Sequence, residues 1–260
     1  RQPDRRPAGS VVGVSPEGRA AGLTAVIIGA RGGIGAALTR ELVARGTYAR
    51  VLALSRAGDA LPVEGAEKGF IDVADEDSIT AAAALAQAAD PIRLVVVATG
   101  VLTVDGVTSP EKTYRQQTRT AFERVFALNT IGPALIAKHF LPRLPREQRT
   151  VFAALSARVG SITDNRIGGW HAYRASKAAL NMLVKTYAIE QTRRNPDSII
   201  VSLHPGTVDT ALSQPFQANV PERQLVSPQS AATNLLDVIK SLTPSDTGKV
   251  FDCAGAEIAP

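Results

Sequence analysis

Short apolar runs alternate along the chain with longer segments in which apolar residues recur at helical spacing. The runs are rich in β-branched residues, and several are apolar almost throughout, as expected of parallel strands buried on both faces. We expect strands at residues 24–28, 50–55, 94–98, 150–155, 199–203 and 249–251, with a weaker candidate at 69–71. Helices are expected at residues 34–45, 77–88, 122–140, 171–192 and 228–241.

This alternation predicts right-handed βαβ units around a parallel sheet. In the first helix Ile34, Leu38 and Leu42 form one apolar stripe, which should face that sheet. We therefore expect an α/β fold, a doubly wound parallel sheet of about seven strands with helices on both faces. Residues 21–260 should form a single domain, preceded by an extension at residues 1–20 that is rich in Pro, Gly and Arg. The one long irregular connection, residues 205–228, is expected to carry function.

Composition narrows the classes of function. Cys253 is the only cysteine, so no disulfide can form within the chain, and no cluster of residues has metal-ligand spacing. The net charge is +5, but the basic residues are dispersed and lack interleaved aromatics, which argues against nucleic-acid binding. The apolar runs are too short to cross a bilayer and the chain opens without an apolar leader, so we expect a cytoplasmic protein without membrane contacts.

The first expected strand leads directly into a glycine-rich turn and then into a helix. The turn reads Gly29-Ala30-Arg31-Gly32-Gly33-Ile34-Gly35. Glycines let the chain turn sharply and bring backbone N–H groups and a helix N-terminus against a pyrophosphate. Glycine clusters also make plain turns, but the order strand, turn, helix indicates a dinucleotide-binding site.

Tyr173 and Lys177 are four residues apart at the head of an expected helix. Four residues is just over one turn, so the phenol and the ammonium share a face. A free tyrosine has a pKa of about 10, and a nearby positive charge favours the phenolate and lowers that pKa. Such a pair can exchange a proton with a carbonyl or alcohol oxygen, although in isolation it is also common on exposed helices.

Together the glycine-rich turn and the Tyr-x-x-x-Lys pair resemble the short-chain dehydrogenase/reductase family, in its single-domain branch. The resemblance extends over residues 23–260. Further motifs in the family's order are Asp72-Val73, Val97-Ala98-Thr99-Gly100, Asn129-Thr130-Ile131-Gly132, Pro205-Gly206 and the tail at residues 248–252. The stretches Ser-Ala-Arg-Val-Gly-Ser-Ile and Gly-Gly-Trp-His-Ala-Tyr are similar to C-factor/sniffer-like members.

The resemblance implies hydride transfer between a nicotinamide and a carbonyl carbon, with a relay of protons. Tyr173 would be the acid/base, Lys177 would lower its pKa and bind the ribose, and Asn129 would hold a water that links Lys177 to solvent. The relay also needs a serine, normally three residues before the glycine after the fifth strand. Ala157 occupies that place.

Two serines flank the missing position. We expect Ser156 to serve as the relay serine, with Ser161 as the alternative. A shift of one residue along a strand turns a side chain to the other face, but a bulge or the end of the strand could re-aim Ser156. A third interpretation, that neither serine is catalytic and activity is weak, stays open.

The end of the second strand indicates the cofactor. NAD-specific members place a carboxylate there to bind the ribose 2′-hydroxyl, whereas this chain has Ser55 and Arg56 and no acid before Asp59. A guanidinium suits a 2′-phosphate, and Arg31 is a second cation in reach, so NADP(H) is expected over NAD(H). With the residues that the resemblance implies, the expected cofactor-binding set is Gly29, Arg31, Gly32, Gly33, Ile34, Gly35, Ser55, Arg56, Asp72, Val73, Ala98, Thr99, Gly100, Tyr173, Lys177, Pro205, Gly206, Thr207, Val208 and Thr210.

The sequence gives few indications of which substrate the protein binds. We expect a pocket lined by Val101, Leu102, Arg158, Val159, Trp170 and His171, with residues 208–225 as a lid. Trp170 suits the core as well as the pocket wall, and His139 and His204 are expected to be structural. The apolar lining favours a modest hydrophobic ketone or aldehyde as substrate.

The sequence is compatible with three functions. The first is an NADPH-dependent carbonyl reductase, and the second is a cofactor-binding signalling or scaffold protein with vestigial catalysis. An epimerase or dehydratase is disfavoured because no separate substrate domain fits in this length. Family members commonly form dimers or tetramers, and the stripe Leu180, Leu183, Val184 and Tyr187 suits either such an interface or packing onto the sheet.

Overall fold

The computed structural model describes residues 22–103, 110–214, 217 and 225–260. The expected extension at residues 1–20 and most of the second half of the expected lid lie outside the described residues. The strands are β1 (Thr24–Ile28), β2 (Arg50–Ser55), β3 (Glu67–Phe70), β4 (Ile92–Val97), β5 (Thr150–Leu155), β6 (Ser198–His204), β7 (Thr207–Val208), β8 (Leu225–Val226), β9 (Val250–Asp252) and β10 (Glu257–Ile258). The α-helices are α1 (Gly33–Arg45), α2 (Glu76–Gln87), α3 (Arg119–Phe126), α4 (Gly132–Phe140), α5 (His171–Arg194) and α6 (Pro228–Ser241).

Eight of the described strands form one large sheet in the order β10-β9-β6-β5-β4-β1-β2-β3. All neighbours in it are parallel except β9 and β10, and β7 pairs with β8 in a separate ribbon. The sheet has 8 strands, so the expectation of about seven missed only the short antiparallel edge strand β10. The predicted doubly wound α/β fold is confirmed.

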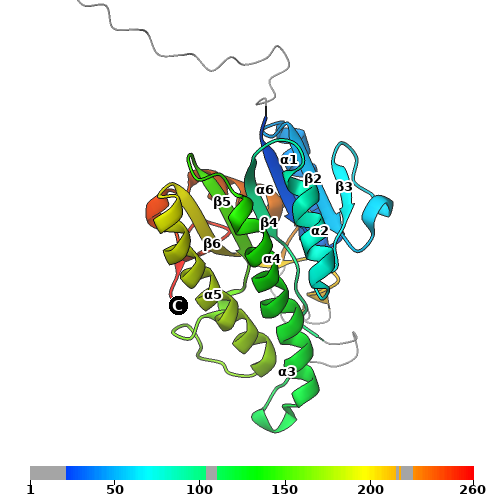
Figure 1. Cartoon of the computed structure of the whole chain (residues 1–260). Helices are drawn as coiled ribbons and strands as arrows, with labels where there is room; N and C mark the ends of the chain where they lie inside the picture. Colours follow the sequence, from blue (N-terminus) through cyan, green and yellow to red (C-terminus); the bar gives the residue numbers. More distant parts are fainter. Residues whose placement is uncertain (1–21, 104–109, 215–216, 218–224) are drawn as a thin grey trace, which may run out of the picture.

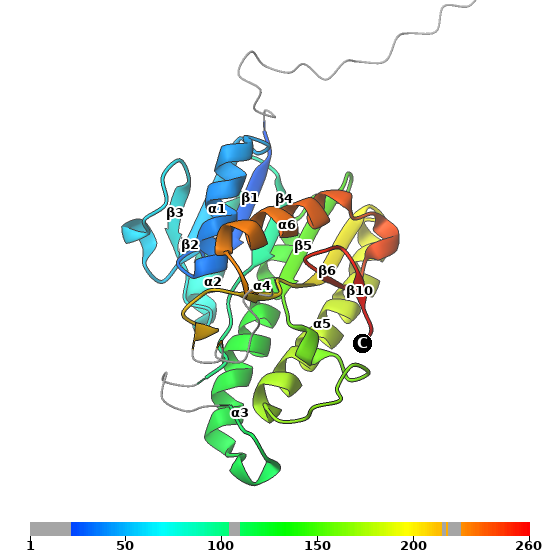
Figure 2. The same ribbon diagram turned by 180° about the vertical axis from the view of Figure 1, so that it is seen from behind.

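Helices cover both faces of the sheet, each over its own buried apolar cluster. Figure 1 shows α2, α4 and α5 in front of the sheet, and Figure 2, from behind, shows α1 and α6. The stripe of α1 behaves as predicted, because Leu38 and Leu42 are buried in the cluster beneath α1 and α6 and Ile34 packs against it. On the other face Leu180 and Val184 are buried in the cluster beneath α2, α4 and α5. Tyr187 packs against the same cluster, so three of the four residues of the α5 stripe face the sheet, and an oligomeric assembly stays a prediction.

One expected helix differs in the structure. The apolar spacing of residues 122–140 predicts a single helix, but α3 and α4 are joined by a π-helical turn, η3 (Ala127–Ile131). A π turn accommodates one extra residue per turn and is frequent at functional sites. The spacing of apolar residues did not reveal it, because the helix axis continues through the turn.

No helix within the described ranges is both long and apolar enough to span a bilayer. The same part of the chain contains no group of three or more His, Cys, Asp or Glu residues placed to hold a metal ion.

Candidate active site

Two adjoining cavities lie at the carboxyl ends of the parallel strands. The strand order places β1 between β2 and β4, which makes the end of β1 the point where the direction of winding reverses. Open α/β sheets bind ligands at such a point. One cavity, of about 390 Å³, lies at the ends of β1 and β2, and the other, of about 320 Å³, reaches the ends of β5 and β6. Ala98, Thr99 and Gly100, which follow β4, line both.

The glycine-rich turn forms the wall of the first cavity. Gly29 has a φ of 91°, and a Cβ there would lie 2.8 Å from the carbonyl oxygen of Ala98. A Cβ on Gly35 would overlap the carbonyl oxygen of Gly29, so any larger residue would push α1 off β1. Helix α1 begins after Gly32 with no side-chain cap and no acid in its first turn. Its first N–H groups are therefore available to an anion in the cavity.

Two arginines and a serine line the far end of the same cavity. Arg31 and Arg56 are exposed, and neither makes an ion pair within the described ranges. The Ser55 hydroxyl oxygen accepts a hydrogen bond from the backbone N–H of Ala57 at 3.1 Å, which leaves its own hydrogen free to donate. The full lining comprises Gly29, Arg31, Gly32, Ser55, Arg56, Ile71, Asp72, Val73, Ala98, Thr99, Gly100, Val101 and Leu128. These donors and the glycine turn fit an adenine dinucleotide, and Thr99 adds a buried hydroxyl that has no hydrogen-bond partner among the described residues.

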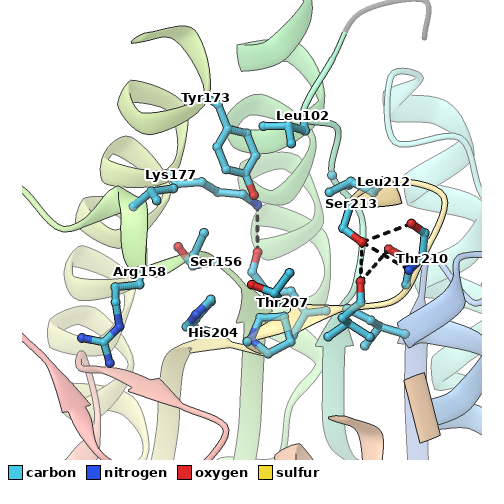
Figure 3. Close-up of a pocket in the computed structure, with 18 of the residues that line it drawn as sticks. Leu102, Ser156, Arg158, Tyr173, Lys177, His204, Thr207, Thr210, Leu212 and Ser213 are labelled. Carbon is cyan, nitrogen blue, oxygen red and sulfur yellow. Dashed lines mark hydrogen bonds between the residues drawn. The ribbon is translucent and has the colours of Figure 1, made fainter. Parts of the chain in front are cut away.

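The second cavity contains the tyrosine and the lysine. Helix α5 places Lys177 Nζ 5.8 Å from the centre of the Tyr173 ring, and Figure 3 shows the lysine side chain running across to the hydroxyl end of the phenol. The Lys177 ammonium donates to the carbonyl oxygen of Leu155, the last residue of β5, at 2.9 Å. This bond ties α5 to the end of β5 and holds the Lys177 side chain in place.

Burial dominates the acid–base properties of the pair. It raises the pKa of Tyr173 to about 12 and lowers the pKa of Lys177 to about 8. Loss of hydration is the cause of the raised tyrosine pKa, and the expected lowering of that pKa by Lys177 stays a prediction. At neutral pH Tyr173 is therefore a protonated phenol, ready to donate, beside a lysine that still carries its charge.

Burial of the Lys177 ammonium should lower the free energy of unfolding of the wild type at neutral pH. Substituting Lys177→Met should raise the free energy of unfolding at pH 7 by about 2 kcal/mol, because the depressed pKa costs more than the lost hydrogen bond to Leu155 contributes. Between a pH of about 8 and 10.5 the folded wild type has released a proton that the unfolded chain keeps. Wild-type stability therefore rises with pH across this window, and the advantage of the variant should shrink there. Urea denaturation at pH 7 and pH 10 checks this, and a variant less stable than wild type at pH 7 would contradict it.

Asn129 lies at the centre of the π-helical turn η3 and is fully buried. Its side chain accepts from the N–H of Val101 and donates to the carbonyl of Val101, both at 2.8 Å. It also donates to the Ser176 hydroxyl at 3.1 Å. A Cβ on Gly100 would lie 3.3 Å from Asn129 Oδ1 and 3.4 Å from Lys177 Nζ, so the glycine keeps the space between these two groups open.

Each candidate relay serine already has a partner. Ser156 lines the second cavity, and its hydroxyl donates to Asn181 Oδ1 at 2.7 Å. Ser161 does not line the cavity, and its hydroxyl accepts from the N–H of Asp164 and donates to the carbonyl of Pro260. Ala157, in the place of the family's serine, also lines the cavity. Ser156 is therefore within the site, but its only hydrogen is committed to Asn181.

Most of the expected substrate-pocket residues line the second cavity. Its lining comprises Ile34, Ala98, Thr99, Gly100, Leu102, Leu155, Ser156, Ala157, Arg158, Val159, Trp170, Tyr173, Lys177, His204, Pro205, Gly206, Thr207, Val208, Thr210, Leu212 and Ser213. Val101 instead lines the first cavity, and His171 lines neither. Trp170 forms part of the wall. Its ring is edge-on to that of Tyr173, with 6.2 Å between the two ring centres.

Leu155 and His204 line this wall but were not among the expected site residues, and Leu212 and Ser213 were expected only as part of the lid. His204 was expected to be structural, although its place at the end of β6, directly before Pro205, was a usable signal. Leu212 and Ser213 reach the cavity from a turn in which the Ser213 hydroxyl donates to the carbonyl of Val208 at 2.5 Å. Nothing in the sequence pattern distinguishes them from the rest of the long connection.

The described part of that connection folds over the glycine-rich turn. A Cβ on Gly33 would lie 2.7 Å from Thr210 Cγ2, so the segment after β7 packs directly on the start of α1. Thr207, Val208 and Thr210 line the second cavity as expected. The lid role of residues 208–225 stays a prediction, because residues 215–216 and 218–224 lie outside the described residues.

Comparisons with known proteins agree with this geometry. The family model described as "short chain dehydrogenase" matches residues 23–221. A 1-hydroxy-2-glutathionyl-2-methyl-3-butene dehydrogenase from Rhodococcus sp. is 29% identical over 227 residues, covering 87% of this chain and 94% of the relative. The C-signal protein of Myxococcus xanthus is 36% identical over 136 residues, covering 52% of this chain and 76% of that protein.

Solved structures share the fold. An NADPH-bound carbonyl reductase from chicken fatty liver superposes with a TM-score of 0.73 at 24% identity, covering 93% of this chain and all of that one. The carbonyl reductase Sniffer of D. melanogaster superposes with a TM-score of 0.75 at 19% identity, covering 92% of this chain and 99% of that one. With the family model, the glycine-rich turn and the Tyr173–Lys177 pair, these findings show that the chain belongs to the short-chain dehydrogenase/reductase family of NAD(P)-dependent oxidoreductases.

Proposed function

We propose that this protein is an NADPH-dependent reductase that converts a small ketone or aldehyde to an alcohol. The observation that carries the proposal is the juxtaposition of Tyr173 and Lys177 in the second cavity, next to the first cavity, whose two arginines make no ion pair with any described residue. The structural neighbours named above support the fold alone, so the argument for NADPH rests on this chain's own residues.

The first cavity supplies the binding groups for the cofactor. The glycine-rich turn and the start of α1 would hold the pyrophosphate, and Asp72 and Val73 would lie beside the adenine. Arg31, Ser55 and Arg56 offer two cations and a hydroxyl for a 2′-phosphate, and among the described residues Asp72 is the one carboxylate that lines this cavity. The end of β2 thus lacks the carboxylate that would bind the ribose 2′-hydroxyl of NAD(H).

The residues of the second cavity would carry out the proton transfer. The chemistry that a bound nicotinamide supplies is transfer of a hydride to the carbonyl carbon. Tyr173 gives its hydroxyl proton to the carbonyl oxygen, and the charged Lys177 stabilises the phenolate that this leaves. A water in the space kept open by Gly100, beside Asn129 and Lys177, would return a proton from solvent. Ser156 can join this relay as a donor only if its hydroxyl leaves Asn181.

The size and lining of the cavity limit the substrate. A volume of about 320 Å³ lies at the lower end of known ligand pockets, and part of it must hold the nicotinamide beside Pro205 and Gly206. Leu102, Val159 and Trp170 provide an apolar wall. The remaining space suits a small, largely apolar carbonyl compound.

A titration with NADPH and NADH tests the proposal. Fluorescence change or thermal shift should show tight binding of NADPH and weaker binding of NADH, followed by NADPH oxidation in a screen of small carbonyl compounds. Absence of binding by either nucleotide would overturn the proposal.

One observation favours a second candidate, a cofactor-binding signalling protein with vestigial catalysis. Ala157 occupies the serine position and the Ser156 hydrogen is committed to Asn181, which would weaken catalysis. The similarity to C-signal fits this alternative as well. The intact Tyr173, Lys177 and Asn129 set favours the enzyme, and a cellular role that survives loss of the Tyr173 hydroxyl would favour signalling.

A further inference from the structure

His204 forms part of the substrate cavity, although neither the fold nor the proton relay requires a histidine there. It is the last residue of β6 and lines the cavity together with Ser156, Arg158 and Thr207. Figure 3 shows its ring between Arg158 and Thr207, on the far side of Ser156 from Tyr173. The cavity therefore has a polar wall facing the tyrosine, in addition to its apolar wall.

The hydrogen bonding of the ring indicates which atom is available. His204 Nδ1 is buried and has no hydrogen-bond partner within the described ranges. A proton on Nδ1 would leave an enclosed donor unsatisfied, which favours the tautomer that carries the proton on Nε2. Because Nδ1 is enclosed, a ligand in the cavity can meet only Nε2, and it would meet a donor.

The charges around His204 indicate a neutral ligand. Burial and the positive charge of Arg158 lower the pKa of His204 to about 4, so the ring is neutral at physiological pH. The Arg158 guanidinium donates to Asp164 at 2.9 Å and to Asp252 at 3.1 Å. Two carboxylates thus already surround the guanidinium of Arg158, which leaves the wall around His204 without excess positive charge for an anionic group of the substrate.

Ser156, the neighbour of His204 in this wall, has no hydrogen to offer, because its hydroxyl donates to Asn181. A substrate oxygen next to it would remain without a donor from the strand end of β5. Nε2 of His204 can supply one from the end of β6.

We propose that His204 is a specificity-determining residue whose Nε2 donates a hydrogen bond to a second, neutral oxygen of the substrate. The reacting carbonyl oxygen faces Tyr173, and the second oxygen, such as a hydroxyl a few bonds away, faces His204. This inference rests on the proposed carbonyl reductase function and names its substrate class as small neutral hydroxyketones and hydroxyaldehydes.

Two isosteric probes test the assignment. 4-Hydroxy-2-butanone and 2-pentanone differ by a hydroxyl in place of a methyl group, so their NADPH-dependent kcat/KM values isolate the second oxygen. The wild type should prefer the hydroxyketone by about tenfold, the typical value of one neutral hydrogen bond. The preference should vanish in His204→Leu and return in His204→Gln, whose side-chain amide places a donor near the position of Nε2. His139→Leu, the same change at a histidine that lines neither cavity, should keep the preference.

A binding experiment separates this inference from the proposed function. The chain has three histidines, so the ring carbon signal of His204 can be assigned in a ¹³C-histidine-labelled sample by comparison with the two variants. With saturating NADP⁺, which cannot reduce a ketone, that signal should shift with 4-hydroxy-2-butanone and not with 2-pentanone. Equal shifts, or a hydroxyketone preference that survives in His204→Leu, would overturn the role of His204. Failure of the wild type to bind NADPH would overturn the proposed function instead.

Discussion

Replacing Tyr173 with phenylalanine should lower kcat for carbonyl reduction by about 10³-fold while NADPH affinity changes less than about twofold. Of the Tyr173 and Ser156 hydroxyls, the phenol is the one free to protonate the carbonyl oxygen, since the Ser156 hydrogen is committed to Asn181. The ring itself would stay in place, because it packs edge-on against Trp170. Steady-state kinetics with a fixed carbonyl substrate and an NADPH titration of each protein measure the two quantities.

Ser156→Ala is the matched control for this experiment. It removes a hydroxyl from the same cavity, and we expect kcat to fall less than about tenfold because that hydroxyl donates to Asn181 rather than towards the substrate. A loss as large as that of Tyr173→Phe would mean that Ser156 leaves Asn181 and works in the relay. A Tyr173→Phe protein that still reduces carbonyls at the wild-type rate would contradict the proposed mechanism.

The elements that carry the fold were readable from the sequence because their apolar pattern is strong. The predicted bounds of β1, β2, β5 and α6 match the structure residue for residue. In these strands nearly every side chain is buried, so the interior of each strand is a continuous apolar run in the sequence. β3 was only a weak candidate, and its exposed Glu67 and Phe70 explain why its pattern is poor.

The site was predictable where chemistry is tied to a motif and not where it depends on packing. The glycine-rich turn and Arg56 could be placed at strand ends, and strand ends meet at one edge of a parallel sheet. The direction in which Ser156 points could not be predicted, because it depends on Asn181, one turn beyond Lys177 on α5. The direction of the Tyr173 pKa shift could not be predicted from the sequence either, since it depends on how far the folded chain removes the phenol from water.

Arg56→Asp should lower the ratio of kcat/KM for NADPH to that for NADH by at least about 100-fold. The guanidinium of Arg56 lies at the end of β2 in the first cavity and has no ion-pair partner among the described residues, so its charge is available to a 2′-phosphate. An aspartate there would repel that phosphate and could accept a hydrogen bond from the 2′-hydroxyl of NADH. The two effects act in opposite directions on the two cofactors, which is why the ratio should change more than either rate.

The ratio of the two kcat/KM values is insensitive to general damage to the enzyme, because a loss of folding or of proton transfer lowers kcat/KM equally for NADPH and NADH. Arg31→Ala removes the second cation from the glycine-rich turn and should change the ratio by about tenfold, the weight of one charge-assisted hydrogen bond. Arg40→Asp reverses a charge on the exposed side of α1, away from either cavity, and should leave the ratio unchanged. If Arg40→Asp changed the ratio as much as Arg56→Asp, the preference would come from the overall positive charge of the protein. An unchanged ratio in Arg56→Asp would refute the assignment of the 2′-phosphate to this end of the cavity.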